Sequence, residues 1–380
     1  MITRIEELIS EYSVRNKKSE DIPVYSVTND RGFCTGYFSK EVASKDKSTY
    51  KIVPRGYFAY NPSRINVGSV DWQNCEDRVI VSPLYVVFSI SEQLDQQYFL
   101  HYLKSDIMLN YIKEYATGSV RDNLKLSDLG KLSVNLRPLD EQRRIAAVLD
   151  KVSDLIAKRR QQLEKLDLLV KARFVEIFGD PEINNKNWQV LPMSKICSVS
   201  SSKRIYKSEQ SSYGIPFWRI SDLNNLINTG KVTPDLYISV ERYKELKSQG
   251  QVPIAGDILI TSRGTLGQCY IVKEEDKFYF QDGMISWLSE YMDNITPIYI
   301  SYLFKMSGFK KQIESMQAGS TVAYLSIAMI KQLKVMLPDI ETQQNFADFV
   351  AQTEKVKSNI KESLTKLETL KKALMQEYFG

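Results

Sequence analysis

Two long stretches of the chain carry apolar residues at steps of three and four positions, which is the spacing of one face of an α-helix. The first stretch holds Ile145, Val148, Leu149, Val152, Leu155, Ile156, Leu163, Leu166 and Val170. The second holds Phe346, Phe349, Val350, Val356, Ile360, Leu364, Leu367 and Leu374. Polar residues fill the positions between them, so the pattern predicts two amphipathic helices with one apolar stripe each.

The flanking residues set the limits of the first helix. Leu139 and Asp140 begin it, and Gly179-Asp180-Pro181 ends it, because Gly and Pro terminate helices. About 37 residues at about 1.5 Å each make a rod of roughly 55 Å. Two similar stripes in one chain are most readily buried against each other, so we predict that the helices pair as an antiparallel coiled coil.

The two helices belong to two copies of one sequence unit. Gly118-Ser119 recurs as Gly319-Ser320, and Phe178-Gly179 recurs as Phe379-Gly380, each 201 positions later. Upstream the match continues with slightly smaller displacements, which indicates small insertions within the duplicated unit. A repeat of about half the chain predicts a pseudo-twofold architecture.

The segments outside the helices mix strand-like and helical runs. Val79–Val81, Tyr85–Phe88 and Ile258–Thr261 are typical of strands, whereas Gln97–Ile112 and Ile298–Gln312 are typical of helices. The fold class is therefore α+β, with two globular domains separated by the two helices. The predicted ranges are a first domain at 1–138, a helix at 139–180, a second domain at 181–337 and a helix at 338–380.

Composition adds mainly exclusions. The chain has 380 residues, which is enough for two domains, and its net charge of +5 permits but does not require binding to a polyanion. Four scattered cysteines and a single histidine, His101, predict neither a zinc site nor a disulfide framework, and are typical of a cytoplasmic protein. Charges near the N-terminus and the lack of a long apolar window argue against secretion and membrane insertion.

At the first helix the sequence resembles a known family. LRPLDEQRRIAAVLDKVSDLIAKRRQQLEKLDLLVKARFVEIFGDP, from Leu136 to Pro181, resembles the central spacer of type I restriction-modification specificity subunits. MLPDIETQQNFADFVAQ, from Met336, resembles the distal spacer, although Thr342 stands in place of Glu141 and Gln344 in place of Arg143. GSVRDNLKLSDLGKLSV and GSTVAYLSIAMIKQLKV resemble the ends of two target-recognition domains, so the resemblance covers essentially the whole chain.

The resemblance implies a non-catalytic DNA-reading subunit. Each recognition domain would enter a major groove of double-stranded DNA, and the helices would set the separation of a bipartite target. Two modification subunits would bring S-adenosylmethionine, flip out an adenine and methylate its N6. Two restriction subunits would bring ATP, Mg²⁺ and cleavage, so the resemblance implies no cofactor, metal or catalytic residue in this chain.

Two loops are candidates for reading bases. Ser262, Arg263 and Thr265 follow a strand-like run, and an arginine fork suits guanine or a phosphate. The counterpart in the first repeat holds Asn61, Ser63 and Arg64, and an asparagine suits adenine. The alternative for either loop is a hairpin turn with a solvated arginine.

Further candidates lie in glycine-containing and basic segments. The segment at Gly118 offers Ser119 and Arg121, and its repeat offers Ser320 and Thr321, where small residues allow a backbone to approach phosphates. Structural turns explain these glycines equally well. The basic candidates for phosphate contact are Lys203, Arg204 and Arg219, and their alternative is a solvated surface.

The starts of the two helices are candidates for contact with the modification subunits. The residues concerned are Asp140, Glu141, Gln142, Arg143, Gln343 and Gln344. A capping role at the helix start is the alternative for the acidic residues.

Enzyme functions find little support in the sequence. Pro234-Asp235 and Glu245-Leu246-Lys247 imitate the carboxylates and lysine of a metal-dependent nuclease, but the segment around Glu245 is predicted as a short exposed helix. The chain lacks an Asn-Pro-Pro-aromatic motif and a GxxxxGK[ST] phosphate loop. Two other functions remain open: a coiled-coil scaffold that binds proteins, and a specificity subunit of a type II or other phage-defence methylation system.

Overall fold

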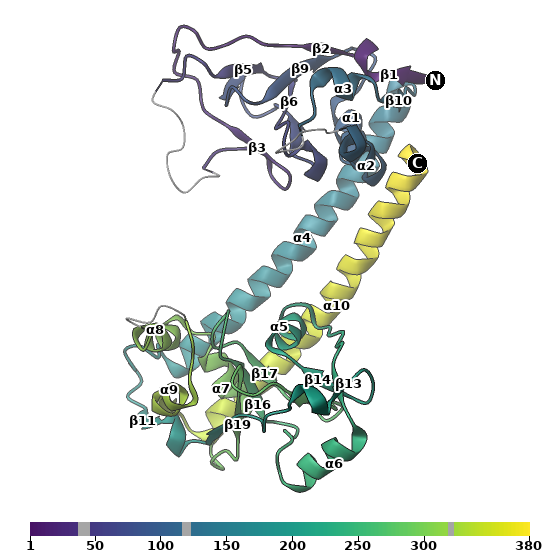
Figure 1. Cartoon of the computed structure of the whole chain (residues 1–380). Helices are drawn as coiled ribbons and strands as arrows, with labels where there is room; N and C mark the ends of the chain where they lie inside the picture. Colours follow the sequence, from purple (N-terminus) through teal and green to yellow (C-terminus); the bar gives the residue numbers. More distant parts are fainter. Residues whose placement is uncertain (37–45, 116–122, 318–322) are drawn as a thin grey trace. The chain divides into compact units, whose positions relative to one another are not determined.

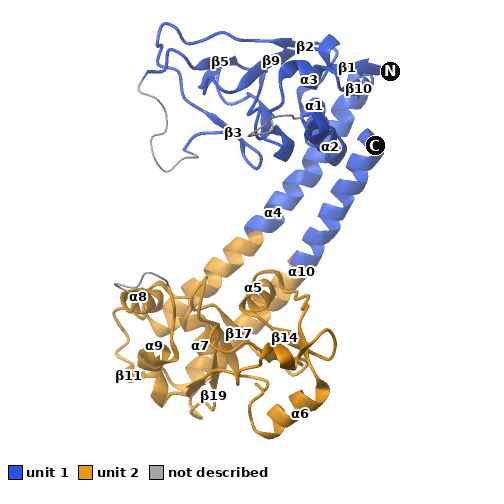
Figure 2. Ribbon diagram, in the orientation of Figure 1, with its two compact units in different colours: residues 1–161, 361–380 blue, residues 162–360 orange. Residues whose placement is uncertain are grey.

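The computed structural model describes residues 1–36, 46–115, 123–317 and 323–380 (Figure 1). The chain forms two compact units, coloured separately in Figure 2: unit 1 is residues 1–161 with 361–380, and unit 2 is residues 162–360. Both divisions fall inside helices of 40 residues, α4 (Leu139–Phe178) and α10 (Ile340–Phe379). Each unit therefore combines one globular domain with part of α4 and part of α10. The ranges predicted from the sequence instead treated each long helix as a segment of its own.

Unit 1 is built on an antiparallel sheet in the order β2-β9-β6-β7. Its strands are β2 (Ile9–Glu11), β9 (Val86–Ile90), β6 (Phe58–Tyr60) and β7 (Val70–Trp72). Three antiparallel pairs accompany it: β1 (Ile2–Arg4) with β10 (Ser133–Asn135), β3 (Ser26–Thr28) with β4 (Gly32–Cys34), and β5 (Lys51–Pro54) with β8 (Arg78–Val81). The shorter helices are α1 (Gln96–Leu103), α2 (Asp106–Tyr115), α3 (Leu126–Gly130) and the 3-10 turns η1 (Ile5–Glu7) and η2 (Ile65–Val67).

Unit 2 repeats this plan with an antiparallel sheet in the order β12-β19-β16-β17. Its strands are β12 (Ser198–Ser200), β19 (Ile285–Ser289), β16 (Ile258–Thr261) and β17 (Cys269–Ile271), and β11 (Gln189–Pro192) pairs with β20 (Lys334–Leu337). A second sheet, β13-β15-β14-β18, contains β13 (Gln210–Ser211), β15 (Tyr237–Ile238), β14 (Ile215–Trp218) and β18 (Tyr279–Phe280). The helices are α5 (Ile220–Thr229), α6 (Val240–Ser248), α7 (Pro297–Leu303), α8 (Ser307–Ser315), α9 (Ile327–Gln332), η3 (Met193–Lys195) and η4 (Lys207–Glu209).

The long helices run antiparallel within each unit. In unit 1, Arg160 of α4 pairs with Glu368 of α10 at 2.7 Å, and Arg137 Nη2 donates to the Tyr378 carbonyl at 3.2 Å. Residue numbers therefore rise along α4 in the direction in which they fall along α10. In unit 2, Asp167 pairs with Lys357 at 2.7 Å. The predicted α+β class with two domains and two long helices is therefore confirmed.

The buried positions of the helices include seven of the seventeen residues in the predicted stripes, and most of the others are half-buried. Ile145, Leu149 and Val170 are buried on α4, and Phe346 and Val350 are buried on α10. The stripes also included three residues that the structure leaves exposed: Val148, Leu155 and Val356. Near Val356 the buried position belongs to Thr353, whose hydroxyl donates to the Phe349 carbonyl at 2.8 Å, so it is satisfied without water.

Two predicted helices are each broken into two. The run Gln97–Ile112 contains α1 and α2, because the chain turns at Lys104 and the Ser105 hydroxyl accepts from the Met108 N–H at 3.3 Å. The run Ile298–Gln312 likewise contains α7 and α8, with Met306 in an extended conformation between them. Neither break carries Gly or Pro, so periodicity alone did not reveal it. No helix among the described residues has the length and apolar character needed to cross a membrane.

The end of each long helix packs on the domain of the other repeat. Phe379, at the end of α10, lies 5.3 Å from the ring centroid of Tyr98 in unit 1. Phe178, at the end of α4, lies 4.9 Å from the ring centroid of Tyr299 in unit 2. The two tyrosines are equivalent positions. Each donates its hydroxyl to a backbone carbonyl of the closing strand of its unit, which is β10 (at Asn135) or β20 (at Met336). Each unit therefore needs residues from both repeats to complete its core.

A buried glutamine connects the start of each long helix to its domain. Gln142 is fully buried, and its Oε1 accepts from the backbone N–H of Asp95, the residue that caps α1, at 2.9 Å. Its Nε2 donates to the carbonyls of Gln93 at 2.9 Å and Arg137 at 2.8 Å. One buried amide thus satisfies three backbone groups.

Gln343 makes the equivalent contacts in unit 2. Its Oε1 accepts from the N–H of Thr296, the cap of α7, at 2.9 Å, and its Nε2 donates to the carbonyls of Asn294 and Pro338, both at 2.9 Å. The prediction that Gln142 and Gln343 contact a partner is replaced by this internal role, because neither side chain is accessible.

We expect Gln343→Ala to lower the free energy of unfolding by about 2–4 kcal/mol, because three backbone groups lose their partner inside the protein. Urea denaturation followed by circular dichroism measures this loss. The exposed neighbour Gln344→Ala is the matched control and is expected to change stability by less than about 0.5 kcal/mol. Equal stabilities of the two variants would contradict the assignment.

Candidate nucleic-acid interface

A cavity of about 410 Å³ opens beside the second sheet of unit 2. Two arginines and two glutamines contribute to its lining: Arg204, Arg263, Gln210 and Gln281. They come from separate segments, namely the chain after β12, the loop after β16, β13 and the residue after β18. The tertiary fold therefore brings hydrogen-bond donors and acceptors from four parts of the sequence to one place.

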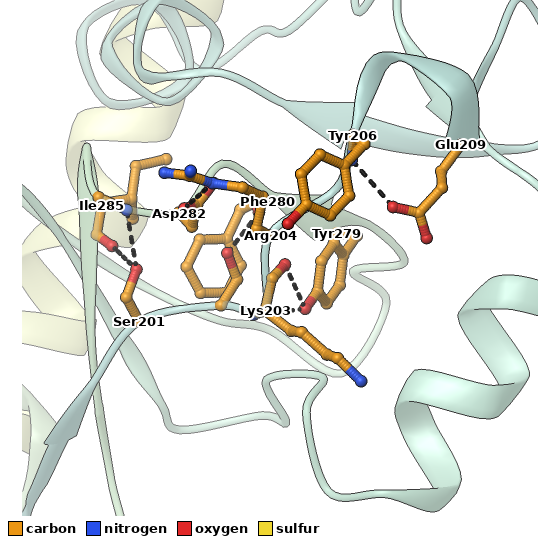
Figure 3. Close-up of polar contacts among 11 residues, drawn as sticks. Ser201, Lys203, Arg204, Tyr206, Glu209, Tyr279, Phe280, Asp282 and Ile285 are labelled. Atoms are coloured by element: carbon orange, nitrogen blue, oxygen red, sulfur yellow. Dashed lines mark hydrogen bonds and ion pairs between the residues drawn. The ribbon is translucent and has the colours of Figure 1, made fainter.

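The segment that carries Arg204 is held by short hydrogen bonds to β18 and its surroundings (Figure 3). Ser202 Oγ donates to the Phe280 carbonyl at 2.7 Å, and Ser201 Oγ donates to the Ile285 carbonyl at 2.7 Å. The Lys203 N–H donates to the Tyr279 hydroxyl at 2.9 Å, and this hydroxyl donates to the Lys203 carbonyl at 3.1 Å. Burial raises the pKa of Tyr279 to about 12, so the hydroxyl keeps its proton near neutral pH.

Arg204 and Lys203 point in opposite directions (Figure 3). Arg204 Nε donates to Asp282 Oδ2 at 2.9 Å, which orients the guanidinium while leaving 64% of the arginine side chain exposed. Lys203 is exposed, and only its backbone takes part in the hydrogen bonds of this segment. Of the two predicted candidates, Arg204 lies in the cavity and Lys203 does not line it.

The loop after β16 divides into buried and exposed positions. Ser262 is buried, and its Oγ lies 2.8 Å from Ser286 Oγ, so its hydroxyl has a structural role. Arg263 is exposed, and its guanidinium carbon lies 5.1 Å from the ring centroid of Tyr324. Thr265 is also exposed. Of the three predicted residues, Arg263 and Thr265 can meet a ligand in this conformation.

The counterpart in unit 1 is a smaller hollow of about 40 Å³. Asn61, Arg64, Asn29 and Tyr85 contribute to its lining. Asn61 Oδ1 accepts from Ser63 Oγ at 3.0 Å, while Arg64 is exposed. Burial raises the pKa of the Tyr85 hydroxyl, so it remains a neutral donor. The predicted cluster of Asn61, Ser63 and Arg64 is therefore brought together at the surface of unit 1.

Both arginine loops lie against the same segment of their repeat. The N–H of Leu124 donates to the Pro62 carbonyl at 3.1 Å, and the N–H of Leu325 donates to the Ser262 carbonyl at 3.0 Å. Leu124 and Leu325 are equivalent, fully buried positions. The candidates Ser119, Arg121, Ser320 and Thr321, just before these leucines, lie outside the described residues.

Arg219 has a structural setting that sequence reasoning did not anticipate. It begins α5, where its backbone N–H donates to Asp222 Oδ2 at 2.8 Å. Its guanidinium pairs with Asp222 and with Asp235. Two carboxylates thus neutralise this arginine, which is not among the residues that line the cavity.

The acidic residues that imitate a nuclease are engaged separately. Asp235 pairs with Arg219, and Glu245 pairs with Arg242 at 2.6 Å. Glu245 lies on α6, in agreement with the short helix predicted there. Within the described parts of the chain, no group of three or more His, Cys, Asp or Glu residues is placed to hold a metal ion.

Four of the six residues that were predicted to contact the modification subunits lie at the surface, at the starts of the two long helices. Asp140 is exposed, and Glu141 pairs with Arg137. Arg143 lines a surface hollow of about 250 Å³ and lies 3.9 Å from Asp95. Gln344 is exposed and donates to Asp348 at 3.2 Å.

Sequence reasoning missed Gln210 and Gln281 in the cavity of unit 2. Gln281 follows β18, its backbone N–H donates to the Trp218 carbonyl at 2.9 Å, and no hydrogen bond of its side chain is found among the described residues. The signal available in the sequence was weak: a polar residue directly after the aromatic run Phe278-Tyr279-Phe280.

Comparison with known proteins gives a consistent result. The family model described as the type I restriction modification DNA specificity domain matches residues 6–166 and 185–371. A protein of Haemophilus influenzae, named provisionally as a type I restriction enzyme specificity subunit, is 27% identical over 278 residues, which are 72% of this chain and 68% of that protein. The MjaVIII specificity subunit of Methanocaldococcus jannaschii is 21% identical over 301 residues, which are 74% of this chain and 69% of that protein.

Solved structures share the fold at low sequence identity. The crystal structure of the type I restriction-modification S subunit from M. genitalium covers 100% of this chain and 96% of its own, with a TM-score of 0.59 and 15% identity. A chain from a structure of a type I restriction-modification system covers 100% of this chain and 97% of its own, with a TM-score of 0.57 and 17% identity.

The arginine loop of unit 2 generates a stability test. We expect Ser262→Ala to destabilise the protein by about 1–3 kcal/mol, because Ser286 loses a buried partner. We expect the adjacent Arg263→Ala to change stability by less than about 0.5 kcal/mol, because the side chain is exposed. Thermal denaturation of both variants measures the difference, and a larger loss for Arg263→Ala would reverse the two roles.

Proposed function

The chain belongs to the type I restriction modification DNA specificity family, and we propose that it reads a bipartite double-stranded DNA target for a methyltransferase and restriction complex. One observation carries the proposal for these residues. Each repeat has an arginine loop, with Arg64 or Arg263, and this loop lies beside a buried leucine at an equivalent position, Leu124 or Leu325. A duplicated reading surface is what a target with two halves requires.

In unit 2 the cavity is lined by arginine and glutamine side chains, which are types that can recognise base edges in the major groove. An arginine can donate two hydrogen bonds to guanine O6 and N7, and a glutamine can pair with adenine N6 and N7. Arg204 and Arg263 therefore suit guanine or phosphate, and Gln281 suits adenine. Asp282 holds Arg204 in place before DNA arrives, which limits the loss of side-chain entropy on binding.

In unit 1 the reading surface has different chemistry. Asn61 is suited to adenine, and Arg64 to guanine or phosphate, with the Tyr85 hydroxyl beside them as a further donor. Because the two domains present different side chains, we expect the two halves of the target to differ.

The partners follow from the family. Two modification subunits would bind the exposed helix starts, where Asp140, Glu141, Arg143 and Gln344 are accessible, and would hold S-adenosylmethionine for adenine N6 methylation. Two restriction subunits would supply ATP-driven translocation and Mg²⁺-dependent cleavage. In this proposal the chain acts in the cytoplasm, holds no cofactor and positions the chemistry of its partners. Family membership favours this function over a protein-binding scaffold.

We expect a bipartite methylation motif that depends on this chain. The test is co-expression with the neighbouring methyltransferase gene, followed by long-read mapping of N6-methyladenine. Exchanging residues 1–138 for the first domain of another family member is expected to change one half of the motif and retain the other. Methylation that is absent from a well-formed complex, or unaffected by the exchange, would refute the proposed function.

We expect Gln281→Ala to relax selection at one adenine of the motif by about 1–3 kcal/mol, because its amide would no longer pair with the base. Competition binding between the motif and single-base variants measures this change. The control is Gln249→Ala, an exposed glutamine beyond α6 that does not line the cavity. Unchanged base preference in Gln281→Ala would remove this residue from the reading surface.

A further inference from the structure

Unit 1 contains a second and larger cavity, of about 810 Å³, between its globular domain and the parts of α4 and α10 that belong to this unit. Lys104, from the turn after α1, lines it together with Arg160 of α4 and Lys371 and Lys372 of α10. The proposed base-reading residues do not line this cavity. The carboxylates of Asp30, Asp106, Asp150 and Glu368 line it as well, so four cationic and four acidic side chains meet here, and the proposed function has used none of them.

Two of these cations, Lys104 and Lys371, are half-buried. Among the described residues, the ammonium groups of Lys104 and Lys371 form no ion pair or side-chain hydrogen bond. Burial lowers the pKa of Lys371, and the nearby charges of Lys104 and Arg160 lower it further. Burial likewise lowers the pKa of Lys104. The nearby carboxylates of Asp71 and Asp30 act in the opposite direction on Lys104 and raise its pKa. Lys371 is thus the group held close to like charge, an arrangement that a bound anion would stabilise.

Among the described residues, no carboxylate around the cavity forms an ion pair with Lys104 or Lys371. Asp150 Oδ1 accepts from Gln97 at 2.7 Å and lies 2.8 Å from His101 Nε2, and the charge of this carboxylate raises the pKa of Lys371. Glu368 is paired with Arg160. Asp30 and Asp106 are exposed, where water and salt screen their charge. Asp150 and Asp71 are half-buried as well, and the charge of Asp71 acts on Lys104, but neither carboxylate forms an ion pair with Lys104 or Lys371.

The equivalent place in unit 2 is constructed differently. Tyr302 occupies the position of His101, and Lys305, the counterpart of Lys104, lies 3.9 Å from the Tyr302 ring centroid. Lys357 is paired with both Asp167 and Glu354 at 2.7 Å. The duplicated fold therefore covers or neutralises its cations in unit 2, so the unpaired lysines of unit 1 are not a necessary product of the architecture.

Asn29 connects this cavity to the candidate reading surface, because it lines both this cavity and the hollow that contains Asn61 and Arg64. We infer that Lys104, Lys371 and Arg160 bind a backbone phosphate of the DNA whose bases unit 1 reads. This inference rests on the proposed function and extends it: the long helices contact DNA as well as joining domains. Such a contact would position the duplex without selecting its sequence.

The test is a salt titration of DNA binding by the full chain in complex with its methyltransferase partner. One duplex carries the mapped motif, and a second carries a scrambled sequence. Lys371→Gln is expected to lower the slope of log affinity against log salt by about 0.9, and to weaken binding to both duplexes equally. Lys371→Arg retains the charge and is expected to retain the slope.

Lys366→Gln is the matched control, because Lys366 lies on the same helix, is 74% exposed and does not line the cavity. If Lys371→Gln binds DNA with the slope of the unmodified complex, the inference is overturned while the proposed function stands. If the unmodified complex does not bind DNA, both fail. If Lys371→Gln abolishes stabilisation by inorganic phosphate in a thermal melt but leaves the DNA slope unchanged, the cavity holds a free phosphate and its assignment to DNA is overturned.

Discussion

The buried amides of Gln142 and Gln343 are the constraint on which the rest of the structure depends. Each joins three backbone groups: the capped start of a domain helix, the residue two before it, and the residue where the chain leaves the closing strand. Because an amide can satisfy these groups in only one orientation, the long helix must leave its domain in a fixed direction. The same three contacts occur in both repeats, so both helices begin in the same way.

The other end of each helix completes the opposite repeat. Phe178 and Phe379 pack on equivalent tyrosines, each of which also donates a hydrogen bond to the closing strand of its domain. A helix is therefore fixed at its start by polar contacts to its own domain and at its end by aromatic contacts to the other. This exchange explains why a compact unit includes both ends of the chain, as residues 1–161 and 361–380 do.

The two repeats share their central sheet and long-helix contacts, which form a common frame, but they differ around the proposed DNA-reading surfaces. The central sheets share one strand order, and the arginine loops lie beside equivalent leucines. Around them, unit 2 adds the sheet β13-β15-β14-β18 with α5 and α6, whereas unit 1 has the β3–β4 and β5–β8 pairs. Frame residues are kept because their packing and hydrogen bonds are shared. The exposed positions carry no such requirement and can change with the sequence that is read.

The sequence by itself determined the repeat, the two long helices and the arginine loops at Arg64 and Arg263, because periodicity and self-similarity are local properties of the chain. Tertiary structure alone decided the rest. It buried Gln142, Gln343 and Ser262, which any sequence pattern would place with exposed polar residues, and it broke two apparent helices without Gly or Pro. It also brought Gln281 to Arg204 and Lys371 to Lys104, because residues far apart in the chain become neighbours only when the core they share has packed.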